Sequence, residues 1–348
     1  MRKLHIGLAA ASAAALTFGT LTAAAGATSA SAADAVSSGG SDAAALAYWT
    51  PARMAAAVDA DTFEVPASDG PVETAAPEAS GAPVSIPFRV ADGGGGGPVD
   101  AAGAQPYLIA QAVPRPYTNN PDRMNVKVFF TKAVGGNFVC SGTVVNSKNL
   151  AMVETAGHCV ADNASHKFHK NVVVVPAYAS GGTSQTTGPF GTWTANRLAT
   201  KSAWINNSTK QFKEDLGYIV TNRLNGKLIV NVTGGQGTRF NLSRSQTPSA
   251  FGYPADSPFN GQSQFRCNSP ILGNDDPGGT GPLALKIRCD MTGGSSGGGW
   301  LIGLNSSGFG FVNGHNDYKY GNDANSLYSP YFGSDALALF NTAQGITV

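Results

Sequence analysis

From about residue 118 onward, the chain consists of short apolar runs separated by Gly, Asn, Ser and Pro. Val, Ile and aromatic residues favour strands, and turn residues at this spacing keep the strands short. We therefore expect an all-β fold, either a sandwich or a pair of barrels, and residues 118–348 are enough for two small barrels. The runs read NVKVFF, GNFVCSGTVV, NVVVVPAY, LGYIVTN, GKLIVNV, LALKIRC, WLIGL and GFGFVNG.

Helical patterns are few. The segment GSDALALFNTAQ near the C-terminus predicts one short helix, with Ser334 as a candidate N-cap. A second piece, AAALAYWTPARMAAAV, predicts a helix broken at Pro51. Only 13% of the residues are charged and 44 are glycine, which suits a secreted all-β protein better than a helical cytosolic one. The net charge of +1 gives no reason to expect nucleic-acid binding.

The first residues predict a secretory signal peptide over 1–33. Arg2 and Lys3 precede an apolar stretch, and the small residues of Ala30–Ala32 form a plausible cleavage site. No other stretch approaches the roughly 18 apolar residues of a membrane-spanning helix. We expect a secreted, extracellular protein with no stable membrane association.

Four cysteines follow the signal, and export makes disulfides the default. Three pairings are possible, and the pairing between neighbours in sequence closes two short loops. Thiol catalysis is not expected in an oxidising compartment, and no C-x-x-C motif indicates a metal. The four residues are Cys140, Cys159, Cys267 and Cys289.

Residues 34–117 differ from the rest in composition. They are rich in Ala, Pro and Gly, carry ten Asp or Glu against three Lys or Arg, and show no hydrophobic core. Residues 118–348 carry eighteen Lys or Arg against twelve Asp or Glu. Opposite charges of this kind allow docking. We expect 34–117 to be an acidic propeptide that is later removed, and the alternative is a disordered spacer.

A hydroxyl nucleophile needs a base, a carboxylate that orients the base, and N–H donors for the oxyanion. Among five histidines, His158 is distinctive because it follows an apolar run, lies in a small-residue turn and adjoins Cys159. His166 and His169 lie in a polar lysine-rich loop without a third metal ligand, so no metal is expected.

Asp215 is the candidate for orienting the base, because it directly precedes the apolar run LGYIV. Most aspartates near turns are exposed, and we expect this of Asp275, Asp276, Asp317 and Asp323. The stretch MTGGSSGGGW holds two serines among glycines between two apolar strands, which indicates an ordered turn rather than a linker. Glycine permits positive φ and lets backbone N–H groups converge on one point.

The motifs TAGHC, DLGYIV and GGSSGG, in this order, resemble the His, Asp and Ser motifs of chymotrypsin-like serine endopeptidases. SAFGYPADSPFNGQ and CDMTGGSSGG look most like the bacterial glutamyl-endopeptidase branch. The resemblance covers roughly residues 120–345. It implies two antiparallel six-stranded β-barrels, divided near residues 235–245, with a short C-terminal helix and the site between the barrels.

The resemblance also implies the roles of the residues. Ser296 is the nucleophile, with Ser295 as its rival, His158 is the general base and acid, and Asp215 holds the imidazole. Backbone N–H groups of Gly294 and Ser296 bind the oxyanion. A monomer that cleaves polypeptide substrates without a cofactor is expected.

Substrate preference stays open between two readings. Asp290 precedes Ser296 by six residues, a spacing that selects Lys or Arg in trypsin-like members. In the glutamyl-endopeptidase branch, a histidine on a later strand reads an acidic side chain, and here either His315 or Asn316 is placed to face the pocket. For each of these residues, the alternative is a polar side chain that faces water and has no role in substrate selection.

Three further points follow from the resemblance. Gly299 stands where the family usually has proline, so the turn is freer. Ser295 replaces the aspartate that pairs with the new amino terminus in trypsin-like zymogens, so activation is expected to need removal of a blocking segment or a contact with another group. Some proteins with this fold are binding or adhesion modules that have lost His or Ser, and a catalytically silent module is the alternative function.

Overall fold

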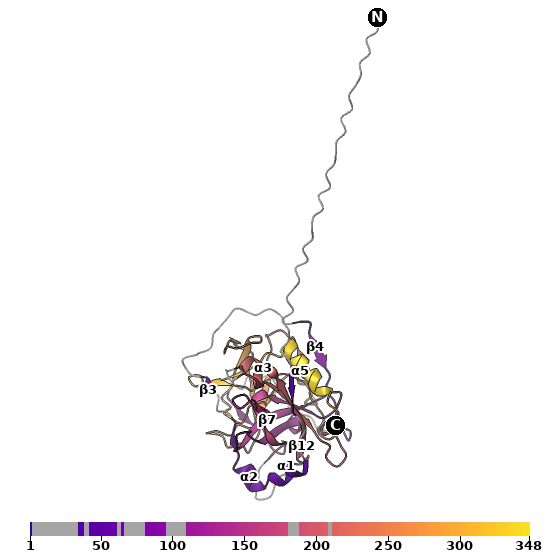
Figure 1. Ribbon diagram of the computed structural model, residues 1–348, viewed down its shortest axis with the longest axis vertical. Helices are drawn as coiled ribbons and strands as arrows, with labels where there is room; N and C mark the ends of the chain where they lie inside the picture. The colour runs from indigo at the N-terminus through magenta and orange to yellow at the C-terminus, as the bar shows by residue number, and fades with distance from the viewer. Residues whose placement is uncertain are drawn as a thin grey trace. The chain divides into compact units, whose positions relative to one another are not determined.

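The computed structural model describes Met1 and residues 34–37, 42–60, 64–65, 81–94, 109–179, 188–207 and 211–348 (Figure 1). Apart from Met1, the predicted signal peptide lies outside this part of the chain. Residues 31–348 form one compact unit. Within it, the described residues build two barrel-like halves, as the all-β fold class predicted.

The first half is a closed antiparallel barrel of six strands. Its hydrogen-bonded order is β12-β11-β6-β7-β8-β13, and β13 pairs back with β12. Alternate residues of β6 face the interior, where Val126, Val128 and Phe130 are fully buried. The strands are β6 (Asn125–Thr131), β7 (Asn137–Val145), β8 (Met152–Ala156), β11 (Lys170–Pro176), β12 (Trp193–Lys201) and β13 (Leu216–Thr221).

The second half consists of two sheets that share a core around Trp300 and Leu285. The seven-stranded sheet has the order β4-β14-β20-β19-β15-β16-β5, and the three-stranded sheet has the order β17-β18-β22. The N–H of Asp317 donates to the carbonyl of Tyr328 at 2.9 Å, which joins the two sheets where β20 ends. The strands are β4 (Val84–Ile86), β5 (Gln111–Ala112), β14 (Gly237–Phe240), β15 (Ser249–Gly252), β16 (Phe265–Asn268), β17 (Gly273–Asp275), β18 (Ala284–Arg288), β19 (Gly299–Ile302), β20 (Phe311–His315) and β22 (Ser326–Ser329).

The remaining elements are short. Two small sheets pair β9 (Ala161–Asp162) with β10 (Lys167–Phe168), and β21 (Lys319–Tyr320) with β3 (Glu64–Val65). The edge strands β1 (Asp34–Val36) and β2 (Val58–Asp59) add to the first barrel. The helices and helical turns are α1 (Asp42–Tyr48), α2 (Pro51–Ala55), α3 (Ser202–Ile205), α4 (Ile229–Thr233), α5 (Ser334–Gln344), η2 (Asp122–Met124), η3 (Gly157–Cys159) and η4 (Phe212–Glu214).

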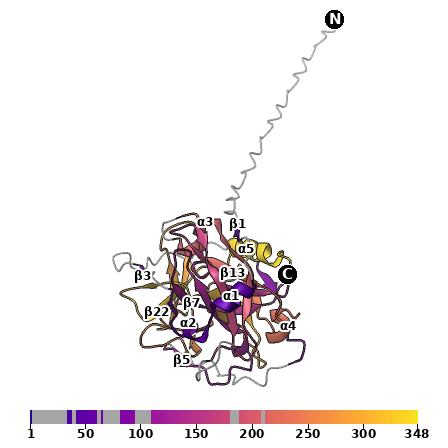
Figure 2. The same ribbon diagram turned by 60° about the horizontal axis from the view of Figure 1, so that its bottom comes forward.

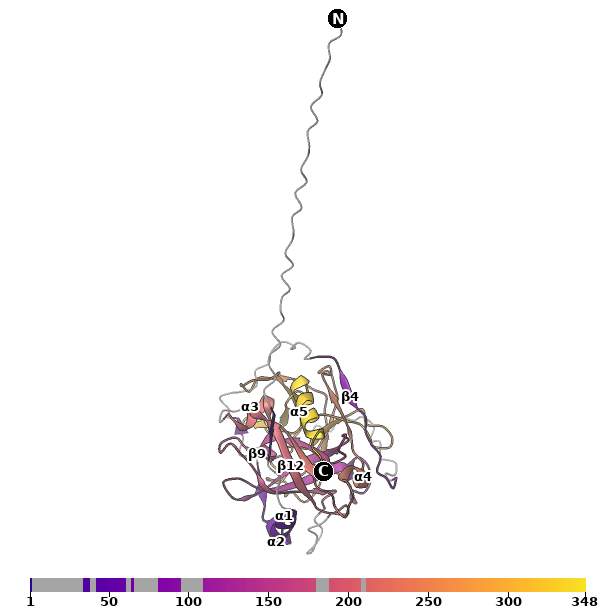
Figure 3. The same cartoon turned by 45° about the vertical axis from the view of Figure 1, so that its right-hand side comes forward.

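The predicted C-terminal helix is present as α5, which packs along β12 and β13 (Figure 3). It buries Ala336, Leu339, Phe340 and Ala343, a spacing of three and four residues that places them on one face. The capping prediction was wrong. The N-cap residue is Gly333, and the hydroxyl of Ser334 donates to Oδ1 of Asn241 at 3.3 Å instead.

One predicted strand is helical. GKLIVNV leads into α4, which begins at Ile229 and ends at Thr233, and Ile229, Val230 and Thr233 are buried. The Thr233 hydroxyl donates to the carbonyl of Ile229 at 3.1 Å, and Gly234 ends the turn at φ 75°. β-branched residues favoured a strand, but burial of one helical face decided the conformation.

The acidic segment packs against the first barrel, although it was expected to contribute no core. The break at Pro51 is confirmed, since Pro51 begins α2 and the Thr50 hydroxyl caps it by accepting from the Arg53 N–H. Trp49 and Met54 are buried against Phe129 and neighbouring side chains of β6, β7 and β11. Figure 2 shows α1 and α2 lying over this part of the barrel.

The cysteines pair between neighbours in sequence. Cys140 on β7 bonds to Cys159 in η3, and Cys267 on β16 bonds to Cys289 at the end of β18. Each bond closes a loop, of 19 and 22 residues respectively. A loop of this length restricts the unfolded chain enough to stabilise the fold by about 3 kcal/mol.

Candidate active site

The structure brings His158 and Asp215 together from separate parts of the first half. His158 lies in η3 after β8, and Asp215 ends η4 just before β13. The Asp215 carboxylate contacts His158 twice. Oδ1 accepts from the His158 backbone N–H at 2.7 Å, and Oδ2 lies 2.8 Å from Nδ1. A Cβ at Gly157 would lie only 2.7 Å from Oδ1, so glycine is needed for this approach.

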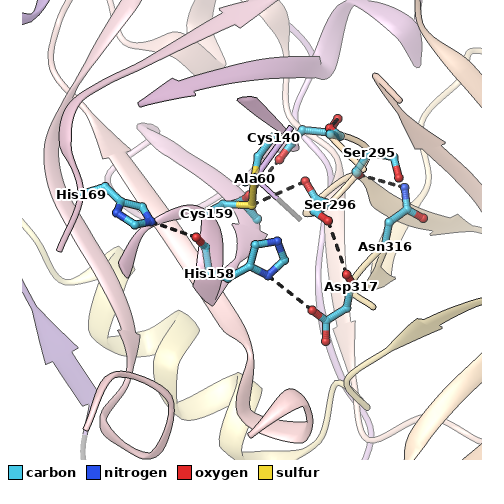
Figure 4. The surroundings of a disulfide bond; sticks show 12 residues. Ala60, Cys140, His158, Cys159, His169, Ser295, Ser296, Asn316 and Asp317 are labelled. Atoms are coloured by element: carbon cyan, nitrogen blue, oxygen red, sulfur yellow. Dashed lines mark hydrogen bonds and ion pairs between the residues drawn. A yellow bond between two sulfur atoms is a disulfide. The ribbon is translucent and has the colours of Figure 1, made fainter. Parts of the chain in front are cut away.

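Two further contacts fix the His158 turn. The disulfide between Cys159 and Cys140 ties the turn to β7 (Figure 4). Nε2 of His169 donates to the carbonyl of His158 at 2.9 Å. His169 is buried and stacked on Phe130, in contrast to the polar loop expected from the sequence. Burial lowers the pKa of His169 to about 4, so its ring stays neutral at ordinary pH.

The serine-rich stretch is an ordered turn, as the sequence predicted. Gly294 and Gly297 have φ of 87° and 77°, a region that side chains rarely adopt. A Cβ at Gly297 would lie 2.5 Å from the carbonyl oxygen of Ser141, so this turn packs directly on β7. The Ser141 N–H also donates to the Ser296 carbonyl at 2.7 Å. The first barrel therefore holds the turn of the second half in place.

Ser296 lies on the same side of the disulfide as His158 (Figure 4). The Ser296 hydroxyl points from the turn toward Asp317, and its Oγ lies 3.4 Å from the backbone carbonyl oxygen of Asp317. The neighbouring Ser295 lies in the same buried turn. Ser296 is only 1% exposed and His158 only 4%, so in the full chain almost none of this pair is open to solvent.

Asp317 is a site residue that sequence reasoning missed. It was expected in an exposed turn, but its side chain is fully buried, with Oδ1 3.6 Å from Nδ1 of His158. Burial, and then the charge of Asp215, raise the pKa of Asp317 far above its usual value. The only sequence signal was its place just after a strand, which many exposed aspartates share. Asp275, also expected to be exposed, is buried and accepts from the hydroxyls of Tyr318 and Tyr320.

The two residues proposed to read a substrate side chain face the interior instead. His315 is fully buried, and its Nδ1 lies 2.7 Å from Oε1 of Glu154 on β8. Asn316 is also buried, with its carbonyl oxygen accepting from the Trp300 indole at 2.9 Å. Burial raises the pKa of Glu154, and His315 opposes that rise. Neither side chain is exposed, so this geometry gives no support to a role in substrate selection.

Asp290 lies on the second half, after β18, and is partly exposed. Its Oδ1 accepts from the backbone N–H of Ala110 at 2.6 Å. Ala110 directly precedes β5, which pairs with β16. In the full chain, the carboxylate proposed for the base of a specificity pocket is therefore held by the acidic segment.

One group of side chains has the composition of a metal site. Single ligand atoms of His158, Asp215 and Asp317 lie within 4.8 Å of one another. A cation there would have to displace the hydrogen bond between Nδ1 and Asp215. The histidines of the H-x-x-H pair do not converge, since His166 contacts the carbonyl of Ile205 and His169 that of His158.

Comparisons with known proteins place the chain in a family. No protein-family model matches it, and no curated protein does. Two solved structures are each 36% identical to it. The protease Anisep from Arthrobacter nicotinovorans has a TM-score of 0.58, with 68% of this chain and 100% of that chain covered. The thermostable serine protease AL20 from an extremophilic microorganism has a TM-score of 0.57, with 65% and 99% covered.

A third structure supports the fold alone. A Glu endopeptidase is 19% identical, with a TM-score of 0.52 and coverage of 70% of this chain and 99% of that one. In the described part of the chain, no helix has the length and apolar character needed to cross a bilayer. The closed barrel, the disulfides and the 36% identity over the full length of Anisep lead to one conclusion: this chain belongs to the family of bacterial chymotrypsin-like proteases.

Proposed function

We propose that this protein is a secreted serine endopeptidase that cleaves polypeptides through Ser296, His158 and Asp215. The observation that carries the proposal is the pair of contacts between the Asp215 carboxylate and His158, beside a serine in a glycine turn. Both disulfides fit an oxidising compartment, which supports secretion. We further propose that it acts as a monomer, needs no cofactor and has no stable attachment to a membrane.

The chemistry follows from the positions of these groups. Nδ1 of His158 carries the proton that Asp215 accepts, so Nε2 is left as the base. Ser296 Oγ attacks the scissile carbonyl carbon and its proton passes to Nε2. His158 then gives that proton to the leaving amine. Water hydrolyses the resulting acyl-enzyme by the same route and restores Ser296.

The glycine turn is proposed to stabilise the charge on the carbonyl oxygen. Backbone N–H groups of Gly294 and Ser296 would bind the oxyanion, as the family resemblance implies. A Cβ at Gly294 would lie 2.7 Å from Cβ of Ala255, so only glycine fits at its φ of 87°. A single oxyanion donor is worth about 100-fold to 1,000-fold in kcat.

We also propose that residues 34–117 act as an inhibitory propeptide. Several of its described pieces pair with the protease strands: β1 with β12, β2 with β7, β4 with β14 and β5 with β16. Asp34 forms an ion pair of 2.8 Å with Lys201, whose side chain is fully buried. This ion pair supports docking through opposite charge.

The end of β2 lies beside the proposed nucleophile turn. The N–H of Ala60 donates to the carbonyl of Val139 at 3.2 Å, one residue before Cys140. A Cβ placed on Gly293 would lie 2.7 Å from Oδ1 of Asp59, so the acidic segment touches the turn that carries Ser296. Ala60 is fully buried next to the disulfide (Figure 4). This contact supports a propeptide that covers the site, with activity released when it leaves.

A fluorophosphonate probe tests the catalytic proposal. The protein is secreted from the full-length gene, its N-terminus is mapped, and the adduct is located by peptide mass. We expect an adduct on Ser296 that is lost in Ser296→Ala and retained in Ser295→Ala, together with hydrolysis of a casein substrate. A form that has lost the acidic segment but gives neither adduct nor hydrolysis would overturn the proposal and leave a protease-fold binding module.

A further inference from the structure

We propose that Asp317 is a positioning residue of this site, a neutral carboxylic acid whose O–H donates to the carboxylate of Asp215. The inference deepens the proposed function and rests on it, because the His158–Asp215 pair must be catalytic for Asp317 to matter in turnover. Its structural part concerns only where a proton is held, and this can be measured whether or not the protein is a protease.

The geometry places Asp317 at the same two groups that make up the pair. Its side chain has no exposed area, and Oδ1 lies 3.6 Å from Nδ1 of His158. One oxygen each from Asp215 and Asp317 lies within 4.8 Å of the other and of the imidazole nitrogen. Its backbone carbonyl is the atom that faces the Ser296 hydroxyl at 3.4 Å. Asp317 therefore touches the site through both its backbone and its side chain.

The carboxyl groups of Asp215 and Asp317 differ in their hydrogen-bond donors. Asp215 accepts from the backbone N–H and from Nδ1 of His158, so its negative charge is well supported. Among the described residues, no donor forms a hydrogen bond within 3.5 Å of either Asp317 oxygen, and Nδ1 of His158, already bonded to Asp215, lies just beyond at 3.6 Å. A buried, ionised carboxylate without a donor is strongly unfavourable, and two such charges this close repel each other. Of the pair, Asp317 is therefore the one that keeps a proton.

A proton on Asp317 removes both the cost of a buried charge and the repulsion from Asp215. The neutral group loses the charge that burial penalises and gains an O–H donor, for which the Asp215 carboxylate is the adjacent acceptor. The titratable groups that face Asp317 are His158 from η3, Asp215 from the end of η4, and Tyr318 next to it in the chain. Burial and the charge of Asp215 both raise the pKa of Asp317, in agreement with this arrangement.

The expected role is to hold the Asp215 carboxylate in the orientation that serves His158. A third hydrogen bond restricts rotation of the carboxylate without adding charge to the site. If Asp317 were ionised instead, a second negative charge near Nδ1 would raise the pKa of His158 and reduce the fraction of neutral base. The proposal thus predicts that removing the titratable group leaves the pKa of His158 almost unchanged.

Carboxyl carbon NMR of the full-length Ser296→Ala protein, labelled at aspartate, tests where the proton is held. The Asp317 signal is assigned by its loss in Asp317→Asn, and Asp323→Asn is a control because Asp323 pairs with Lys286 away from the site. We expect the Asp317 signal to show the protonated form at pH 7. A signal that titrates with an apparent pKa below about 5, near the ordinary value, would overturn the proposal.

Kinetics of the secreted, active form test the positioning role. Asp317→Asn keeps an N–H donor at the same place, so we expect kcat/KM within about threefold of wild type and an unchanged acid limb of the pH profile. Asp317→Ala removes the donor and should lower kcat on the order of tenfold with little change in KM. Equal losses in both variants, or an acid limb that moves down by a pH unit in Asp317→Asn, would overturn it. An inactive wild type would instead count against the proposed function, and the NMR result would still decide the location of the proton.

Discussion

Asp215 contacts His158 through both carboxylate oxygens, with Oδ1 on the backbone N–H and Oδ2 on Nδ1. The backbone contact fixes where the carboxylate lies, and the ring contact fixes which nitrogen carries the proton. Both depend on Gly157, because a side chain there would collide with Oδ1. We therefore expect catalysis to depend strongly on the charge of Asp215.

If Asp215 orients His158 as proposed, Asp215→Asn should lower kcat about 10⁴-fold, the effect of the equivalent change in a Ser-His-Asp protease. The amide can still bond to the ring but favours the wrong tautomer, which leaves Nε2 protonated. The measurement is kcat of the active secreted protein on a peptide substrate. Asp323→Asn is the matched control and should retain wild-type kcat, whereas a loss under tenfold in Asp215→Asn would mean that another carboxylate orients His158.

Trp49→Ala in the full-length chain should speed labelling of Ser296 by a fluorophosphonate probe. Trp49 is 4% exposed and packs against Phe129, and truncating a buried tryptophan costs about 3–5 kcal/mol of packing. Loosened docking exposes the site more often. Leu46→Ala is the matched control, because Leu46 lies on α1, three residues before Trp49, but is 44% exposed. Equal labelling rates in the two variants would contradict the proposed covering role.

Gly299→Pro should lower the free energy of unfolding by about 3 kcal/mol, even though proline is usual at this place in the family. The Gly299 N–H donates to Oγ1 of Thr143 at 3.2 Å, and a Cβ on Gly299 would lie 2.6 Å from the same oxygen. Urea unfolding in a Ser296→Ala background measures the change. Adding Thr143→Ala should recover part of the loss, and no recovery would place the strain elsewhere.

Lys127 should make stability rise with pH. Burial lowers its pKa to about 7, while the unfolded chain keeps a value of about 10.4. Between these values the unfolded state binds more protons, so the free energy of unfolding rises from pH 7 to pH 10 and is lowest below pH 7. At about 1.4 kcal/mol for each pH unit between the two values, the gain approaches about 4 kcal/mol.

Urea unfolding of Lys127→Met and its parent, both carrying Ser296→Ala, measures this dependence. The unfolding free energy of the parent minus that of Lys127→Met should increase from pH 7 to pH 10. The other titrating groups are common to both proteins and cancel in this difference. Lys127 Nζ donates to the carbonyl of Gly261 at 2.7 Å, so part of the difference is independent of pH. A parent and variant with parallel pH curves would show that Lys127 keeps its charge when folded.

The sequence alone predicted much of this protein, because the relevant signals are local. Alternating apolar runs with turn residues predicted the strands, and the family motifs pointed to His158, Asp215 and Ser296. Glycine at positions 294 and 297 is tied to backbone conformation, which a short stretch can specify. The short loops closed by pairing Cys140 with Cys159 are likewise visible in the chain.

Only the tertiary structure decided which polar residues are buried and what they face. Asp317 and Asp323 look alike in sequence, yet Asp317 lies buried beside His158 and Asp323 forms a partly exposed ion pair with Lys286. His315 turns inward because Glu154, from the other barrel, supplies its partner. Burial and pairing depend on residues far apart in the chain, so the site's electrostatics emerge only when the two halves pack together.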